Sequence, residues 1–184
     1  IKIEPPEGDP MRAMGPHFFK TESAYFICAN RNKQSVTLDL RSERGRAIFY
    51  DLVKVSDVVY DNFRPGVVQK LKIDYATLKP INPRIICCSI SGFGQTGPCR
   101  DRPAFDIALQ ALSGAMSITG NSDEPARMGI PMGDLAGGMY AAFAVAAALF
   151  QREKTGEGCC IDIGLLDSLV SLLTYNAQYY FHDG

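Results

Sequence analysis

The chain has 184 residues, a formal net charge of −1 and 46% hydrophobic residues, a composition typical of one soluble globular domain with a sizeable core. A charge this close to neutral gives no indication of a nucleic-acid or membrane partner. An anionic ligand would therefore be held by local basic residues and not by the field of the whole protein.

Six cysteines and two histidines are present, and neither set predicts a metal centre. The cysteines form no C-x-x-C motif, and two pairs are adjacent in sequence, Cys87-Cys88 and Cys159-Cys160, so that on strands their side chains point to opposite faces. A reactive thiol is the functional interpretation. We favour buried, reduced cysteines of a cytosolic-type protein.

Neither end of the chain has the pattern of a natural terminus. The first residues, IKIEPPEGDP, alternate between apolar and charged side chains as inside a strand and lack an initiator Met. We therefore expect a segment of a longer protein, a single incomplete domain over residues 1–184. No signal peptide is visible, and we expect a cytoplasmic protein, or a mitochondrial one in a eukaryote.

Strand and helix patterns alternate along the first half of the chain. Ser42 is placed to cap a helix, Pro65 to open one at a favoured first position, and Asp74 to cap a short third one. The run RIICCSIS is almost continuously apolar, as in a strand buried on both faces. The predicted strands cover residues 1–4, 34–40, 57–61 and 84–91, and the first two helices cover about 43–55 and 65–71.

The second half continues this alternation. A loop rich in Gly, Pro and charge precedes a helix over 105–114, a second loop over 120–133, a long helix over 134–154, a strand over 159–163 and a final apolar helix over 165–180. This order predicts the α/β fold class, with a mostly parallel sheet and helices on both faces. Since ligands of such sheets bind at the carboxyl ends of strands, we expect the site in the loops after Asp61, after Ser91 and before Asp134.

The long helix carries an uncharged run over residues 135–150. A membrane-spanning helix needs about 20 such residues. This run is shorter, rich in Ala and flanked by charge, so we expect the buried central helix of a soluble protein.

Asp134 is the strongest candidate for chemistry in the sequence. It stands before the long apolar helix in the string GIPMGDLAGGMY, where free backbone N–H groups stabilise a carboxylate. One interpretation is a structural N-cap. The other is a functional carboxylate, because Gly133, Gly137 and Gly138 leave room for a ligand or another backbone. Close helix packing is a second explanation for the glycines.

Four segments resemble class III CoA-transferases, of the formyl-CoA, carnitine and succinyl-CoA-dependent type, in the order and at the spacing of that family. Together they cover nearly the whole chain. They are NRNKQSVTLDLRSERGR, VVYDNFRPGVVQKL, NPRIICCSISGFGQTGP, and GDLAGGMYAAFAVAAALFQREKTGEG followed by IDIGLLDS. The resemblance implies part of a large, Rossmann-like CoA-binding domain that lacks its first strand and the small C-terminal domain, in a protein that forms an interlocked homodimer.

The resemblance also implies a reaction. An Asp at the position of Asp134 attacks an acyl-CoA thioester, and an aspartyl-CoA thioester forms through a mixed anhydride. A carboxylic acid then takes up the CoA. The partners implied are therefore acyl-CoA and a carboxylic acid, with coenzyme A as substrate and no metal.

The CoA contacts of the family map onto Leu38 and Arg41 after the second strand, onto Asn62 and Phe63, and onto Lys70. A basic side chain suits the CoA phosphates and an aromatic ring packs on adenine. From the residues alone, a helix start at Asn62 and Phe63 and solvated charges at Arg41 and Lys70 are the alternatives.

Two other functions use the same fold. Racemases of this superfamily carry a His-Asp pair where this chain has Phe105-Asp106, and Phe cannot act as the base that moves a proton beside a thioester. An α-methylacyl-CoA racemase-like isomerase is therefore disfavoured. A non-catalytic CoA-binding homologue is the third hypothesis.

Overall fold

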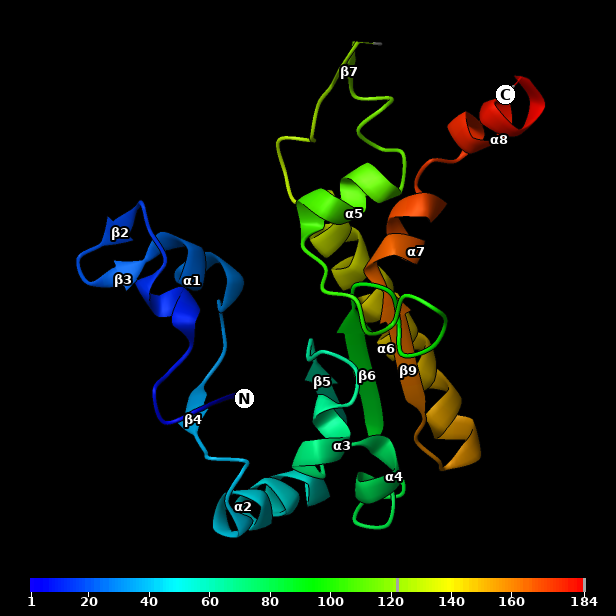
Figure 1. Cartoon of the computed structure of the whole chain (residues 1–184). Coiled ribbons are helices and arrows are strands. Elements are labelled where there is room, and N and C mark those ends of the chain that lie inside the picture. Colours follow the sequence, from blue (N-terminus) through cyan, green and yellow to red (C-terminus); the bar gives the residue numbers. More distant parts are fainter. Residues whose placement is uncertain (122, 184) are drawn as a thin grey trace. The chain divides into compact units, whose positions relative to one another are not determined.

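The computed structural model describes residues 1–121 and 123–183. The chain divides into two compact units, Ile1–Lys54 and Val55–Gly184, whose elements are labelled in Figure 1. The expected α/β class is confirmed, since parallel strands alternate with helices in both units. The single incomplete domain over 1–184 stays a prediction.

The first unit is built on a parallel pair, β1 (Lys2–Glu4) and β4 (Ser35–Thr37). The sequence pattern predicted both strands but only a Pro/Gly loop after the first. The connection instead contains η1 (Pro10–Ala13), β2 (Phe18–Phe19), β3 (Glu22–Ser23) and α1 (Ala24–Ala29). The helix α2 (Glu43–Lys54) follows β4, and Ser42 Oγ accepts a hydrogen bond of 3.0 Å from the Gly45 N–H near its start, as predicted.

A buried carboxylate ties the parts of this unit together. Glu4 is 2% exposed and accepts hydrogen bonds of 2.9 Å from both Nε and Nη2 of Arg12, and one of 2.7 Å from Ser35 Oγ. The Arg12 hydrogen bonds lower the pKa of Glu4 to about 2, against the smaller opposing effect of burial. The carboxylate therefore stays ionised and links η1 to the strand pair.

The second unit is centred on a three-stranded parallel sheet with the order β5 (Val58–Asp61), β6 (Ile86–Ser91), β9 (Cys160–Gly164). Every residue of β6 is buried, as its apolar sequence predicted. Side chains alternate between the faces of a strand. On one face Cys88 and Ile90 join the core cluster with Leu109, Ala141, Leu165 and Leu169.

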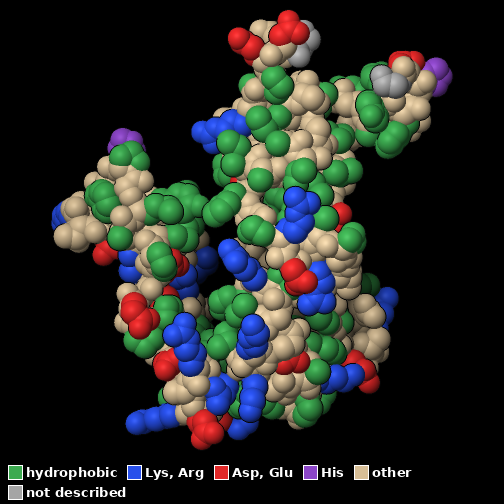
Figure 2. All heavy atoms as spheres, in the orientation of Figure 1, with side chains coloured by type: hydrophobic (Ala, Val, Ile, Leu, Met, Phe, Trp, Pro, Cys, Tyr) green, Lys and Arg blue, Asp and Glu red, His purple; other side chains and the backbone are tan. Residues whose placement is uncertain are grey.

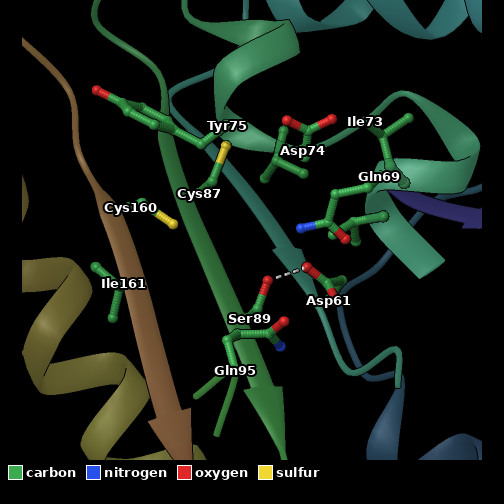
Figure 3. A pocket seen from close by; sticks show the side chains of 12 residues that line it. Asp61, Gln69, Ile73, Asp74, Tyr75, Cys87, Ser89, Gln95, Cys160 and Ile161 are labelled. Atoms are coloured by element: carbon green, nitrogen blue, oxygen red, sulfur yellow. Dashed lines mark hydrogen bonds between the residues drawn. The ribbon is translucent and has the colours of Figure 1, made fainter. Parts of the chain in front are cut away.

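The other face of the sheet closes over a cavity of only about 60 Å³, which Figure 3 shows from close by. Cys87 and Cys160, paired across β6 and β9, line it together with Ser89 and Asp61. Burial raises the pKa of Cys87 to about 12 and that of Cys88 to about 11. Both thiols are protonated at neutral pH, in agreement with unreactive buried cysteines. The expectation of burial is wrong for Cys28 and Cys160, which are exposed.

Helices and one hairpin complete the second unit. They are α3 (Val67–Leu71), α4 (Tyr75–Leu78), α5 (Asp106–Leu112), the hairpin β7 (Gly120–Asn121) and β8 (Glu124–Pro125), α6 (Met132–Thr155), α7 (Leu165–Ser171) and α8 (Tyr175–Asp183). The longest, α6, packs on β6, β9 and α7. Apolar side chains stay exposed around α5, α7 and α8, as Figure 2 shows; they include Ile107, Leu112, Val170, Tyr179 and Phe181.

Three predicted helix boundaries are wrong. Pro65 does not open α3, because Gly66 takes a left-handed φ of +84° and the helix begins only at Val67. The single helix predicted over 165–180 is two helices, α7 and α8, interrupted where Thr174 has a φ of +48°. The long helix starts at Met132 and not at Asp134.

The expectation of a buried central helix is met on one face of α6 only. Ala136, Gly137, Ala141 and Ala148 are buried, whereas Phe143 is 78% exposed. By length and by a mean hydropathy of 1.4, α6 passes a test for a membrane-crossing helix, a test that core helices of soluble proteins also pass. Its packing against β6, β9 and α7 favours the core-helix interpretation.

Candidate active site

A cavity of about 340 Å³ lies in the second unit, at the carboxyl ends of β5 and β6. This is the edge at which parallel sheets bind ligands. Its walls come from the loops after β5 and β6, from the segment before α5 and from the first turn of α6. The lining residues are Asn62, Phe63, Arg64, Pro65, Ser91, Gly92, Arg100, Arg102, Pro103, Ala104, Phe105, Asp106, Asp134 and Leu165.

Asp134 is the third residue of α6 and its side chain opens into this cavity. Across residues 1–121 and 123–183, no hydrogen bond or ion pair involves its carboxylate. The N-cap interpretation is therefore wrong. Asp134 is an exposed carboxylate held in place through its backbone, available to a ligand.

The capping task falls to Asp106, at the start of α5. Its Oδ1 accepts a hydrogen bond of 2.7 Å from the Gly133 N–H and one of 3.3 Å from the Asp134 N–H. A side chain from another helix thus occupies the free donors at the N-terminus of α6. This contact, over 27 residues of sequence, lies beyond what a local capping pattern predicts.

The environment raises the pKa of the Asp134 carboxyl above its ordinary value. Partial desolvation is the larger cause, and the negative charge of Asp106 is the second. A carboxylate that is partly desolvated and accepts no hydrogen bond from the protein keeps more of its basicity, and with it its strength as a nucleophile. Asp106 and Asp134 therefore divide two roles between them: one binds the helix end and the other stays free.

The glycines around Asp134 have different surroundings. A Cβ atom at Gly133 would lie 2.9 Å from Asp106 Oδ1, and one at Gly137 would lie 2.3 Å from Leu165 Cδ2. Both positions therefore need glycine for close packing, the alternative that the sequence left open. Gly138 has nothing within 4 Å of such a Cβ.

Asn62 and Phe63 stand at the end of β5 and reach the same cavity as Asp134. Asn62 Nδ2 donates a hydrogen bond of 2.9 Å to the Ile90 carbonyl, which ties this loop to β6. The Phe63 N–H donates to Asp61 Oδ1 at 3.0 Å, and Asp61 in turn accepts from Ser89 Oγ at 2.6 Å, the bond drawn in Figure 3. The Phe63 ring is 41% exposed and presents an apolar surface at the rim.

The other three predicted contact residues lie outside this cavity lining. Lys70 is exposed on α3. Leu38 and Arg41 belong to the first unit, where the Leu38 N–H donates to the Glu4 carbonyl at 2.9 Å and Arg41 is exposed in the turn before α2. Their roles toward CoA stay predictions.

Sequence reasoning gave no role to several residues of the cavity. Arg64, Arg100 and Arg102 bring three positive charges to its wall from the loops after β5 and β6. Ser91 closes β6, is 4% exposed, and its Oγ has no hydrogen-bond partner within the part of the chain that the structure describes. In that same part, no three His, Cys, Asp or Glu side chains gather as metal ligands would.

Known proteins similar to this chain were found by sequence and by structure. The sequence model of CoA-transferase family III matches residues 1–184. The chain is 45% identical to the acetyl-CoA:oxalate CoA-transferase of Acetobacter aceti, over 95% of this chain and 46% of that protein. It is 44% identical to the mouse succinyl-CoA:glutarate CoA-transferase, over 98% of this chain and 42% of that protein.

Among solved structures, a CAIB/BAIF family protein from Brucella suis superposes with a TM-score of 0.94 and 41% identity, over 99% of this chain and 50% of that one. The chain thus spans about half the length of the relatives it matches. The family match covers every residue from 1 to 184. This chain belongs to CoA-transferase family III.

Proposed function

We propose that the protein transfers CoA from an acyl-CoA to a carboxylic acid, with Asp134 as the nucleophile. The observation that carries the proposal is the Asp134 carboxylate, which has no hydrogen-bond partner among residues 1–121 and 123–183 and opens into a cavity of about 340 Å³. The family membership and the names of the relatives support it, because these relatives are CoA-transferases that use carboxylic acids.

The reaction begins when a carboxylate oxygen of Asp134 attacks the thioester carbonyl carbon of the donor. The C–S bond breaks, the CoA thiolate leaves, and a mixed anhydride joins the acyl group to Asp134. The thiolate then attacks the Asp134 carbonyl, which releases the donor acid and leaves an aspartyl-CoA thioester. The acceptor carboxylate reverses these two steps and departs as its CoA thioester. No proton has to be moved in the sequence.

The residues around Asp134 supply what this sequence needs. The three arginines of the cavity wall stabilise negative charge on thiolate, carboxylate or phosphate groups. Asn62 and Phe63 contact CoA beside Asp134, and CoA contacts are also proposed for Leu38, Arg41 and Lys70. We further propose that the whole protein is a homodimer.

The isomerase alternative needs a base beside the thioester. Phe105, at the position where the racemases carry their histidine, lines the cavity with a side chain that cannot take a proton. An α-methylacyl-CoA racemase-like activity is therefore the weaker proposal. A non-catalytic CoA-binding homologue would have no reason to keep an unpartnered carboxylate in a cavity.

Trapping of the acyl-enzyme tests the proposal. The whole protein, with any sequence that precedes or follows these residues, is incubated with acetyl-CoA, succinyl-CoA or formyl-CoA and then with hydroxylamine. We expect a hydroxamate on the peptide that contains Asp134, since hydroxylamine attacks both the anhydride and the aspartyl thioester. The Asp134→Ala variant is the control and gives none.

Two results would contradict the proposal. An enzyme that binds CoA but forms no adduct with any donor does not use covalent transfer, and an isomerase or a binding protein becomes the better interpretation. An adduct on another carboxylate, retained in Asp134→Ala, would keep the transferase activity but move its nucleophile.

A further inference from the structure

Asp106 joins α5 to the start of α6 through a partly buried network of hydrogen bonds. Its Oδ1 accepts from the Gly133 and Asp134 N–H groups, and its Oδ2 accepts a hydrogen bond of 2.7 Å from Gln110 Nε2. Gln110 is 0% exposed; its Nε2 also donates to the Ile130 carbonyl at 3.3 Å, and its Oε1 accepts from the Met128 N–H at 2.8 Å. One glutamine therefore fixes Asp106 and the loop that leads into α6 at the same time.

This arrangement has a cost that calls for an explanation. Asp106 brings a second negative charge to the group that must ionise, and a Cβ at Gly133 would crowd its Oδ1 at 2.9 Å. A Ser or Thr at the residue before α6 would cap the helix locally without that charge. Pro131 stands there instead and offers no side-chain hydrogen bond. The cap is thus supplied from α5, beside the nucleophile.

We propose that Asp106 is a positioning residue for Asp134: it occupies the N–H groups at the start of α6 so that the Asp134 carboxylate is not drawn into capping them. Without Asp106, the Gly133 and Asp134 N–H groups lose their acceptor, and the Asp134 side chain on the same first turn is a carboxylate that could replace it. A carboxylate that accepts hydrogen bonds from its own helix is turned away from the cavity and is a weaker nucleophile.

The titration of Asp134 depends on the charged side chains that line the same cavity. Asp106 from α5 is the acidic one, and Arg64, Arg100 and Arg102 from the loops are the basic ones; α7 contributes only the apolar Leu165 to the cavity. The inference rests on the proposed function for its meaning. Its first readout, however, needs no substrate. A diazo reagent esterifies carboxyl groups in their protonated form, so the pH dependence of Asp134 esterification, read by peptide mass spectrometry, reports its titration.

Three variants of the whole protein separate the possibilities. Asp106→Asn keeps a carbonyl acceptor and removes the charge, Asp106→Ala removes both, and Asp123→Asn is the matched control on an exposed acid outside the cavity. In both Asp106 variants we expect the midpoint of Asp134 esterification to move to lower pH than in the wild type. In Asp106→Ala, where Asp134 itself accepts the helix N–H groups, the midpoint moves furthest.

The kinetic expectation differs between the two variants. In Asp106→Ala, kcat falls about tenfold or more with little change in the KM for acyl-CoA, because a nucleophile that caps its helix is misoriented but the binding site is intact. Asp106→Asn restores most of that kcat, since its amide oxygen accepts the same two hydrogen bonds. A purely structural role would lower thermal stability, but Asp106→Ala and Asp106→Asn, which lose the same charge, would then have the same Asp134 midpoint.

The inference is overturned if Asp106→Ala moves the esterification midpoint no further than Asp106→Asn does, or if Asp106→Ala folds and keeps the wild-type kcat. Should Asp106→Ala not fold, the kcat of Asp106→Asn decides: this variant keeps both hydrogen bonds to the start of α6, so a kcat about tenfold or more below that of the wild type and of Asp123→Asn would overturn the inference. A wild type that forms no hydroxamate at Asp134, but whose esterification still responds to Asp106→Asn, would end the proposed function and leave the positioning contact standing.

Discussion

A charged side chain stands near each end of α6, and the two differ in their hydrogen-bond partners. At the C-terminal end, Arg152 is 6% exposed and its guanidinium donates to Asp57 Oδ1 at 2.8 Å, to the Arg84 carbonyl at 3.1 Å and to the Asp57 carbonyl at 3.4 Å. At the N-terminal end, Asp134 has no such partner in the portion of the chain that the structure describes. The helix α6 thus has a hydrogen-bonded charge, Arg152, at one end and a free charge, Asp134, at the other. The first anchors the helix and the second faces a cavity.

The presence or absence of hydrogen-bond partners distinguishes a structural charge from a functional one better than residue type does. Both residues are charged, both lie in the terminal turns of the same helix, and a pattern-based analysis would assign both to the helix dipole, acid at the N-terminus and base at the C-terminus. Only the partners distinguish them. Arg152 holds elements together through its two Nη groups, although its Nε has no partner among the described residues. A charge kept without any partner beside a cavity is instead available to a ligand.

The largest effect is expected at the free charge. Asp134→Asn should lower the rate of CoA transfer by about 10³-fold or more while leaving CoA affinity and the unfolding transition nearly unchanged, because it removes the nucleophile and no hydrogen bond. Steady-state kinetics and calorimetric titration with CoA measure the two quantities. Asp123→Asn serves as the control. If the variant lost stability and activity together, Asp134 would belong with the anchoring charges.

Substitution of the hydrogen-bonded charge, Arg152, should instead lower the stability of the fold. Arg152→Ala removes the donor of the Arg84 carbonyl and of the Asp57 carboxylate, whereas the Asp57 carbonyl keeps the Ile86 N–H as a donor, so we expect a loss of about 2–4 kcal/mol in the free energy of unfolding. Chemical denaturation of the whole protein measures it. Lys154→Ala, whose ammonium lies 4.4 Å from the Phe150 ring at the surface, is the matched control with an expected loss below about 1 kcal/mol.

Substitutions at two adjacent glycines, Gly137 and Gly138, test how tightly α6 packs against α7. In Gly137→Ala the new methyl would meet Leu165 Cδ2 at 2.3 Å, so we expect a destabilisation of about 1–3 kcal/mol as that side chain shifts. In Gly138→Ala the methyl meets nothing within 4 Å, and the lower entropy of the unfolded chain should stabilise the fold by about 0.4–1 kcal/mol. Thermal melts of the two variants compare them. Equal effects would mean that packing does not explain Gly137.

Sequence reasoning found the parts of this comparison that rest on local patterns. The apolar run of β6, the Ser42 cap and the alternation of strands and helices depend on neighbouring residues, and the structure has them where they were predicted. Asp134 was singled out by its place before the apolar helix, by the glycines near it in sequence and by its position in a family pattern. Its lack of partners and its place in a cavity are properties that only three-dimensional contacts reveal.

The features that sequence reasoning did not predict also depend mostly on contacts that no local pattern reports. The Asp106 cap and the Arg152 anchor join residues 27 and 95 positions apart, and no periodicity reports such pairs. The break between α7 and α8 falls at a left-handed Thr174, a residue type that seldom takes that conformation and therefore gives no warning. The cavity arginines sit in loops, where one pattern is typical of both a solvated and a functional charge.

The smallest expected effect is a pH dependence of the free energy of unfolding that comes from Asp134, the free charge. The pKa of Asp134 is raised in the folded state, so protonation of this residue favours folding: the contribution is complete below the ordinary value of 3.8 and is lost as pH rises through the folded pKa. Asp134→Asn lacks this titration. It should therefore be more stable than the wild type at neutral pH, by less than about 1 kcal/mol because solvent screens an exposed carboxylate. The advantage should shrink as pH falls toward 3.8, which denaturation of both proteins across that range measures. A constant difference at every pH would mean that the carboxylate titrates normally, and that its reactivity toward a thioester derives from its position in the cavity and not from its environment.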